Sequence, residues 1–392
     1  MAKLINLKPF REFVQSESLG GIILIVCVII SLIVANSPAA GAFQNLLNTE
    51  LGVHTEGIHL RYPLLLWIND GLMAVFFLLV GLEIKRELVE GELSSFKKAA
   101  LPIFAALGGV LAPAAIYFLL NNNTDTAAGW GIPMATDIAF AIAIITMLGS
   151  KVPSSLKIFL AALAIVDDLM AILVIAIFYS SELHYTYLMY AAAIFAVLLA
   201  MNRAGVKNIA AYLVPGLFIW YFIHHSGVHA TIAGVLTAFA IPTTPDAQES
   251  PLEKLEHVLM KPVNFVIMPV FALSNTNITF EAGMLEGLTT TLGLGIILGL
   301  VIGKPLGISL LSWLTVKLGI SSMPGGANWS HIVGVGMLGG IGFTMSVFIA
   351  LLSFPGEHLI LSEAKFSILT GSVLSGILGY AMLASVGRRA AR

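Results

Sequence analysis

The sequence predicts an all-α polytopic membrane protein with about twelve transmembrane helices. Of its 392 residues, 58% are hydrophobic and only 11% are charged, and the mean hydropathy is +0.93. Soluble domains contain about 25% charged residues, so a soluble fold cannot bury this much apolar surface. Apolar runs of about 18 to 25 residues recur along the chain, each long enough to cross a hydrocarbon core about 30 Å thick. The alternating segments of outer-membrane barrels have only about 10 residues, so helical spans are expected.

Basic residues separate sharply between the two sides of the predicted bundle. Hydropathy places the spans at roughly 19–36, 62–84, 99–120, 127–148, 155–179, 185–201, 208–223, 227–242, 256–274, 290–316, 331–353 and 364–386. Arg61 and Lys365 then lie on one side and Lys304 lies inside a span, so the other 17 of the 20 basic residues share the opposite side. The positive-inside rule therefore predicts that both termini are cytoplasmic. Because the outer loops are short, we expect one transmembrane domain over residues 1–392.

Two segments outside the spans have patterns of their own. The N-terminal basic and apolar stretch imitates a secretory signal, but it contains Glu12 and Glu17. Apolar residues at i, i+3 and i+4 from Phe10 indicate instead a short interfacial helix at about 8–17, and the first span is expected to be retained. The first outer loop, at about 45–61, alternates apolar and polar residues around a turn, which predicts a small periplasmic β-hairpin.

Five charged residues fall inside predicted spans, where each costs about 2.5–3.5 kcal/mol or more. They are Asp70, Asp137, Asp167, Asp168 and Lys304. Any one of them can be a structural polar group that finds its partners inside the protein, and we assign this role to Asp70. Four acids and one base together in a single membrane domain indicate a functional site.

Asp167 and Asp168 are adjacent on one predicted helix and differ by about 100° around its axis. One carboxylate can therefore bind an ion while its neighbour pairs with a base. The two acids are expected to titrate as a coupled pair. Carboxylate oxygens suit a hard cation, which here would be sodium, and protons compete for the same oxygens. The pair is the predicted metal site.

Two predicted spans are interrupted by glycine or proline, at 129–137 and at 336–344. They occupy matching places in two units of three spans, the third to fifth and the tenth to twelfth, as in inverted repeats whose broken helices meet at mid-membrane. Asp137 and Lys304 have the charges needed to offset the exposed ends of such helices. A glycine-rich helix interface is the simpler alternative. A separate stripe of glycines at every fourth residue from Gly295 to Gly307 predicts close helix packing.

Seven separated motifs give the chain a recognisable pattern. They are LWIND at 66–70, FFLLVGLE at 76–83, ATDIAF at 135–140, IVDDL at 165–169, SGVHAT at 226–231, GKPLG at 303–307 and GIGFTMS at 340–346. With these motifs in this order, the sequence resembles the NhaA family of bacterial sodium/proton antiporters along essentially its whole length.

The resemblance implies secondary active exchange of Na⁺ or Li⁺ for H⁺ across the bacterial inner membrane. It implies that Asp167 and Asp168 form the ion and proton site, that Lys304 pairs with Asp167 as charge compensation and proton carrier, and that Thr136 and Asp137 lie where the broken helices cross. More than one proton per sodium would make the exchange electrogenic, in the service of sodium and pH homeostasis. The expected partners are sodium, lithium, protons, the lipid bilayer and a second copy in a homodimer, with no cofactor and no nucleic acid.

The resemblance also implies regulation by pH. The family's cytoplasmic cluster is matched by Glu83, Glu87, Glu256 and His257, whereas Met260 stands where some members carry another histidine. His229 matches a family position associated with the pH response, and a packing role for it is equally open. Two further histidines, at 224 and 225, are interpreted as ordinary interfacial residues.

Two other functions are alternatives to ion exchange. An intramembrane aspartyl protease needs two acids on facing helices, but Asp167 and Asp168 are adjacent on one helix and no Gly-x-Gly-Asp motif occurs in a span. We therefore expect no catalytic residues and no enzyme activity. A sodium-coupled symporter for a small organic solute is the alternative within transport, and no basic or aromatic substrate pocket is evident in the sequence.

Overall fold

The computed structural model describes residues 8–55, 59–180, 182–243, 250–280 and 284–390. Within these residues, eight helices are long and apolar enough to cross a membrane, and two bent helix pairs raise the number to as many as ten. This confirms the predicted class, an all-α polytopic membrane protein. The predicted number of twelve spans is not confirmed, because two of the predicted spans form helices of only 15 and nine residues. Nine residues rise only about 14 Å, less than half of a hydrocarbon core.

The first half of the chain contains the helices that precede and include the acidic motif. Its elements are α1 (Lys8–Ala35), α2 (Ala40–Leu47), β1 (Glu50–His54), β2 (His59–Pro63), α3 (Leu64–Leu66), the π-helical segment η1 (Trp67–Leu72), α4 (Met73–Val89), α5 (Phe96–Asn121), the 3₁₀ helix η2 (Ala127–Met134), α6 (Ile138–Met147), the 3₁₀ turn η3 (Gly149–Lys151) and α7 (Ser154–Phe178). Because α1 is one unbroken helix, the residues expected to form an interfacial helix at 8–17 are its first turns.

The second half of the chain adds an outer pair of helices and the second repeat unit. Its elements are α8 (Tyr185–Arg203), α9 (Ala210–His224), α10 (Ile232–Ala240), α11 (Pro251–Pro262), the π-helical segment η4 (Val263–Ile267), α12 (Met268–Asn275), α13 (Met284–Gly287), α14 (Thr291–Leu298), the π-helical segment η5 (Gly299–Gly303), α15 (Lys304–Lys317), α16 (Trp329–Gly339), α17 (Phe343–Ser353) and α18 (His358–Ala390).

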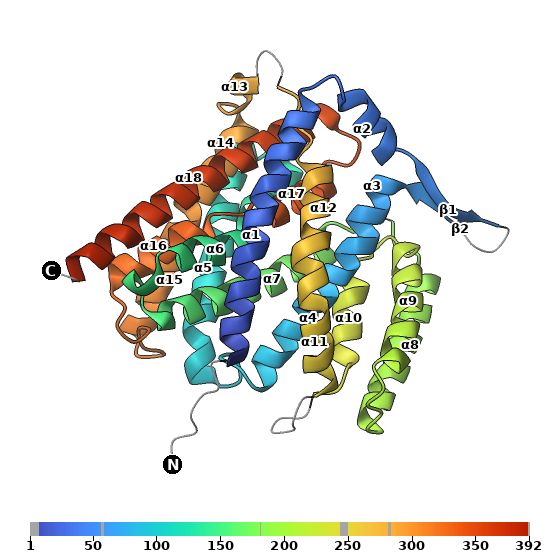
Figure 1. Cartoon of the computed structure of the whole chain (residues 1–392), viewed down its shortest axis with the longest axis horizontal. Coiled ribbons are helices and arrows are strands. Elements are labelled where there is room, and N and C mark those ends of the chain that lie inside the picture. Colours follow the sequence, from blue (N-terminus) through green and yellow to red (C-terminus); the bar gives the residue numbers. More distant parts are fainter. Residues whose placement is uncertain (1–7, 56–58, 181, 244–249, 281–283, 391–392) are drawn as a thin grey trace.

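The two strands form the only sheet among the described residues, an antiparallel pair that projects from one end of the bundle (Figure 1). Glu50 lies opposite Pro63, and Arg61 forms an ion pair with Glu50 across the pair, with 2.9 Å between Nε and Oε2. The strands lie in the loop where the sequence predicts a hairpin, and the residues between them, 56–58, lie outside the described part of the chain.

Both predicted interruptions are present. The first lies between η2 and α6, and the second lies between α16 and α17, which are bent by 46° relative to each other. Around them, α5 packs along α15, and the glycine stripe provides the close approach that the sequence predicts. A Cβ added to Gly307 would lie 2.0 Å from the carbonyl oxygen of Gly108. The backbones of the two repeat units are therefore in direct contact at these glycines, and a larger residue at either position would prevent this contact.

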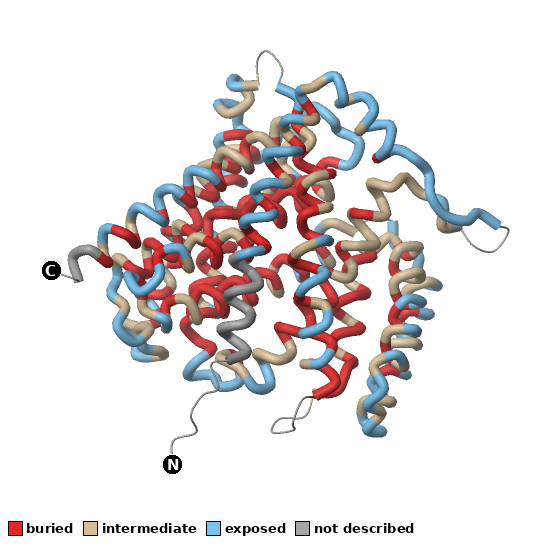
Figure 2. Tube along the Cα trace, viewed as in Figure 1, coloured by how far each residue is buried: buried red, intermediate tan, exposed pale blue. Residues whose placement is uncertain are grey.

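Burial is concentrated where the interrupted helices meet α7 (Figure 2). In an apolar 18-residue stretch of α7, 72% of residues are buried, against 11% in the corresponding stretch of α8, which lies at the edge of the bundle beside α9 (Figures 1 and 2). The helix that contains the two adjacent acids is thus shielded by protein on most sides, whereas α8 has the exposed apolar surface expected of a lipid-facing helix.

Candidate ion-binding site

The extended segments that interrupt the two broken helices cross and bond to each other. The backbone N–H of Asp137 donates to the carbonyl oxygen of Ile341 at 2.6 Å, and the Ser346 hydroxyl donates to the carbonyl oxygen of Ile132 at 2.7 Å. Backbone groups inside a membrane must find partners within the protein. These two bonds supply such partners at the point where the helical pattern fails, and they fix the two segments against each other.

Asp137 stabilises the first turns of two helices. Its Oδ1 accepts from the backbone N–H of Phe140 at 3.2 Å, so it is the N-cap of α6. Its Oδ2 accepts from the backbone N–H and the hydroxyl of Thr344, at 3.0 and 2.5 Å, in the first turn of α17. Asp137 is buried, and its negative charge lies at two positively polarised helix ends. This accounts for an acid at this position without an ion bound to it.

Lys304 and Asp167 form an ion pair inside the protein. The ammonium contacts Asp167 Oδ2 and donates to the Thr136 hydroxyl at 2.9 Å, and the lysine and the acid are 0% and 1% exposed. The Thr136 oxygen lies 2.5 Å from Asp167 Oδ2 and 2.9 Å from the carbonyl oxygen of Gly339, at the end of α16. Thr136 therefore links the ion pair to the negatively polarised end of the second broken helix.

The second oxygen of Asp167 remains available. Asp167 Oδ1 is buried and accepts no hydrogen bond from the part of the chain that the structure describes. A buried carboxylate oxygen without a donor is costly, because it has lost its bonds to water. A proton or a cation at this oxygen would remove that cost, so the carboxylate is suited to bind either.

Asp168 faces a different space from its neighbour. It is 3% exposed and borders a cavity of about 20 Å³ that Asp167 does not line. The cavity is lined by Phe76, Leu79, Val80, Glu83, Thr136, Asp137, Ile138, Ala139, Asp168, Val263, Asn264, Met268, Thr344 and Met345. A cavity needs about 10–15 Å³ to hold one water. This space therefore fits a single water or a bare cation, among oxygen atoms that suit sodium.

Four residues that the resemblance assigns to pH sensing lie around Arg86: its charge interacts with Glu83, Glu87 and Glu256, and the charge of His257 acts on Glu256. Glu87 and Glu256 share the guanidinium of Arg86, with N to O distances of 3.3 Å in both cases. The sequence prediction did not include Arg86, although its position between Glu83 and Glu87 along the chain was a usable signal. Glu83 also borders the small cavity beside Asp168, and His257 is exposed. The structure thus places Glu83 with the ion site rather than only with the acidic cluster.

Asp70 lies outside the ion site and has a partner that the sequence did not reveal. His224 Nδ1 is 3.2 Å from Asp70 Oδ2, and the His224 ring stacks on Trp220 with centroids 5.6 Å apart. His224 is therefore more than an interfacial residue. His229 packs edge-on against Phe348 at 5.7 Å, and its Nδ1 is buried without a hydrogen bond from any described residue. The geometry shows a packing contact for His229 and no contact with the acidic cluster.

A multi-pass bundle with a buried ion pair at the crossing of two broken helices defines a secondary transporter of the inverted-repeat class. Comparison with known families adds the particular group. Residues 11–383 match the family described as Na+/H+ antiporter 1, and the chain belongs to this family. The resemblance predicted from the seven motifs is confirmed.

Curated relatives support the same assignment over nearly their whole length. The chain is 64% identical over 389 residues to "Na(+)/H(+) antiporter NhaA 2" of Flavobacterium johnsoniae, covering 99% of this chain and 95% of the relative. It is 52% identical to "Na(+)/H(+) antiporter NhaA" of Flavobacterium psychrophilum, covering 95% and 94%. The protein of the same name from Yersinia enterocolitica is 50% identical, with 95% and 96% covered.

Proposed function

We propose that this chain exchanges Na⁺ or Li⁺ for more than one H⁺ across the bacterial inner membrane, without a cofactor and with both termini in the cytoplasm. The main observation behind the proposal is the buried ion pair of Lys304 and Asp167. The next residue, Asp168, borders a cavity large enough for one bare cation. Membership of a sodium/proton antiporter family supports the same ions. The cell would use this exchange for sodium and pH homeostasis.

Exchange follows from competition for the same oxygens. A cation that enters the cavity beside Asp168 needs negative charge, and Asp167 can supply more of it only by loosening its contact with Lys304. The lysine then lies buried without its counter-charge, which is unfavourable unless it releases its proton. One proton from the acid pair and one from Lys304 would leave for each sodium bound. Reprotonation from the other side would release the cation.

Access from the two sides requires relative movement, because Asp167 and Asp168 are both nearly unexposed. The hydrogen bonds of Asp137 and Thr136 tie the broken helices to each other, so these helices would move as one unit. The cavity is closed on its other side by α4 and η4, which contribute Glu83 and Asn264. A shift of the helix unit past α4 would open the cavity to one side and close it to the other.

The first prediction concerns purified protein in vesicles that hold a preformed acid interior. We expect added sodium or lithium, but not choline, to dissipate the pH gradient, and the initial rate to change when a membrane potential is imposed. A net charge that crosses the membrane in each cycle couples the rate to the potential, at about 2.3 kcal/mol per charge per 100 mV.

Protein-free vesicles treated identically give the leak rate. If clamping the potential leaves the initial sodium-driven rate unchanged, the exchange is electroneutral and the proposed stoichiometry is wrong. A gradient that sodium dissipates only in the presence of an added organic solute would identify a symporter instead.

A second prediction tests the acidic cluster as the pH sensor. Glu256→Gln imitates a protonated carboxyl and removes one of the two ion pairs of Arg86. We expect the pH at half-maximal exchange to move in the alkaline direction by about one unit, the equivalent of about 1.4 kcal/mol, while the maximal rate stays within about twofold of wild type. The measurement is the initial rate of sodium-driven exchange from pH 6 to pH 9.

Glu253→Gln is the comparison variant, because Glu253 is a partly buried acid on the same helix α11 whose side chain caps that helix at Ser250. Its charge acts on Arg86 and Glu256 without an ion pair to Arg86, so its pH profile should move clearly less than that of Glu256→Gln. An unmoved profile for Glu256→Gln would direct the search to His229.

A further inference from the structure

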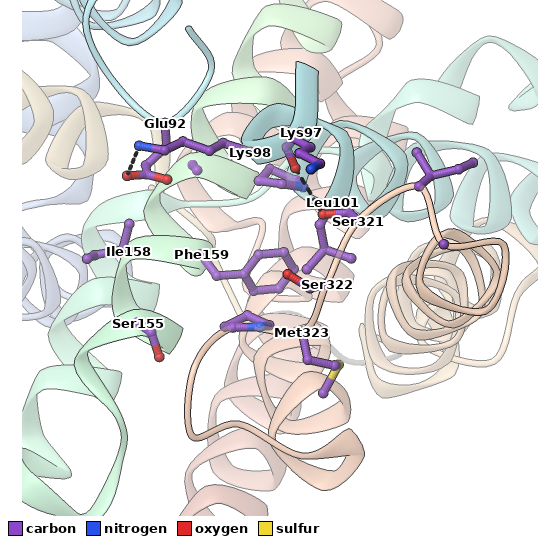
Figure 3. Close-up of a pocket in the computed structure, with 15 residues that line it drawn as sticks. Glu92, Lys97, Lys98, Leu101, Ser155, Ile158, Phe159, Ser321, Ser322 and Met323 are labelled. Carbon is purple, nitrogen blue, oxygen red and sulfur yellow. Dashed lines mark hydrogen bonds and ion pairs between the residues drawn. The ribbon is translucent and has the colours of Figure 1, made fainter. Parts of the chain in front are cut away.

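A polar cavity lies at the end of the bundle where α5 and α7 begin. It has a volume of about 690 Å³ and lies between these two helices and the loop after α15. Figure 3 shows the side chains around it. Its polar lining consists of Glu92, Lys97, Lys98, Ser155, Ser321 and Ser322, and its floor is apolar, with Leu101 and Phe159. Nothing in the proposed exchange uses this cavity.

The charge in this cavity is positive and incompletely balanced. Lys98 pairs with Glu92 at 3.6 Å, whereas the Lys97 ammonium makes no ion pair with any residue that the structure describes. Two lysines also stand in the first turn of α5, where the helix dipole disfavours positive charge, and this turn contains no acidic residue. Such an arrangement is expected where an anion compensates the lysines.

The backbone adds further donors in the same place. Both α5 and α7 begin at the cavity, neither has an acid in its first turn, and the residue before each makes no capping hydrogen bond through its side chain. The first N–H groups of a helix have no partner within the helix. Ser321 is held close by its hydroxyl, which donates to the carbonyl oxygen of Lys97 at 3.2 Å, and Ser322 is exposed beside it.

The rim of the cavity has exposed apolar and aromatic side chains of the kind found at a membrane surface. Phe96 and Leu318, which adjoin it, are 75% and 63% exposed. Immediately before Leu318, the Lys317 ammonium lies 4.4 Å above the ring of Trp313, a pairing that suits the boundary between lipid and water. Basic pockets between transmembrane helices at the cytoplasmic surface bind the head groups of anionic lipids.

From these observations we propose that the cavity between α5, α7 and the loop after α15 binds a phosphate group, supplied by the head group of an anionic phospholipid or by a free phosphate compound. Lys97 and Lys98 supply the charge, and Ser322 and the helix ends supply hydrogen bonds, since the hydroxyls of Ser155 and Ser321 already donate to the carbonyl oxygens of Gly325 and Lys97. The apolar floor takes the adjoining carbon chain. The exposed apolar rim favours the lipid as the source.

The test uses the full-length chain in neutral detergent at constant sodium concentration, with the rise in unfolding temperature as the measure of binding. The probes are short-chain phosphatidylglycerol, phosphatidylcholine of the same chain length, and inorganic phosphate. We expect phosphatidylglycerol to bind the wild type more tightly than phosphatidylcholine does. Lys97→Gln should weaken its binding about fivefold, and Lys97→Gln with Lys98→Gln about twenty-fivefold, as expected for about 1 kcal/mol per lysine.

Two further variants distinguish binding in the cavity from a general attraction of anions to the basic surface. Lys207→Gln removes a lysine in the loop between α8 and α9, on the same basic side and outside the cavity, and should leave binding unchanged. Ser322→Trp keeps both lysines and fills the cavity, so it should weaken binding as much as the double variant. This variant keeps the test valid if the double lysine variant is unstable.

The outcomes are distinct. Lysine-dependent binding of phosphatidylglycerol alone supports the site and identifies a lipid, and lysine-dependent binding of inorganic phosphate supports the site with a soluble source. Equal binding by wild type and double variant, equal loss in Lys207→Gln, or unchanged binding in Ser322→Trp would overturn the proposal. Absence of binding by both anionic probes would overturn it as well.

Discussion

Asp168→Asn is expected to abolish sodium binding and exchange together. The carboxamide has almost the same shape but no charge, so the cavity of about 20 Å³ beside it loses one of the acids that line it, while Asp137 is already bonded to two helix ends. Sodium affinity should fall at least about hundredfold, the equivalent of about 2.7 kcal/mol. Isothermal calorimetry in detergent, repeated at several pH values, measures both the heat of binding and the protons released.

Asp70→Asn is the control for this experiment. It makes the same chemical change to another intramembrane acid, which pairs with His224 instead of bordering the cavity. We expect it to bind sodium with nearly wild-type affinity. If Asp168→Asn binds sodium like the wild type and releases as many protons, the ion site lies elsewhere and the mechanism proposed above fails.

Breaking the ion pair of Lys304 and Asp167 is expected to cost stability as well as transport. Lys304→Ala leaves a buried carboxylate without its cation, and Asp167→Asn leaves a buried ammonium without its anion. Removing one partner of a buried pair costs about 3–5 kcal/mol, because the remaining charge has lost both water and partner. Both variants should stop normal exchange, and both should unfold at a markedly lower temperature than the wild type.

The double variant Asp167→Asn with Lys304→Met makes this prediction specific. It removes both charges and retains the volume of the long side chain, so it should regain much of the stability that either single variant loses. Exchange should stay absent, because the titrating groups are gone. Strictly additive losses of stability in the double variant would contradict an ion pair at this position.

Lys365→Ala is the matched control for Lys304→Ala. Lys365 also lies in a helix of spanning length, but it makes no ion pair with any described residue, so its removal leaves no acid without a partner. We expect its unfolding temperature and exchange rate to remain close to those of the wild type. A comparable loss in this variant would show that truncating a lysine on a spanning helix destabilises the bundle without breaking an ion pair.

The class of this protein and the residues of its ion site could be predicted from the sequence alone. Apolar length and the cost of a charge in lipid are local properties, so Asp167, Asp168 and Lys304 stood out before any contact was known. Glycines and prolines likewise placed the two interruptions, because their effect on a helix is local. The number of spans could not be predicted in the same way. Hydropathy predicts a full span at 227–242, where the helix, α10, has only nine residues.

The contacts between these residues could be identified only once the packing of the helices was known. Helical periodicity gives the face on which a side chain lies but not the helix that faces it. Asp137 bonds to Thr344, 207 positions away, and caps two helices rather than joining the lysine pair. Arg86, absent from the predicted site, holds Glu256, and Glu83 turns to the cavity beside Asp168. These outcomes depend on how separate helices pack, which no single segment of sequence contains.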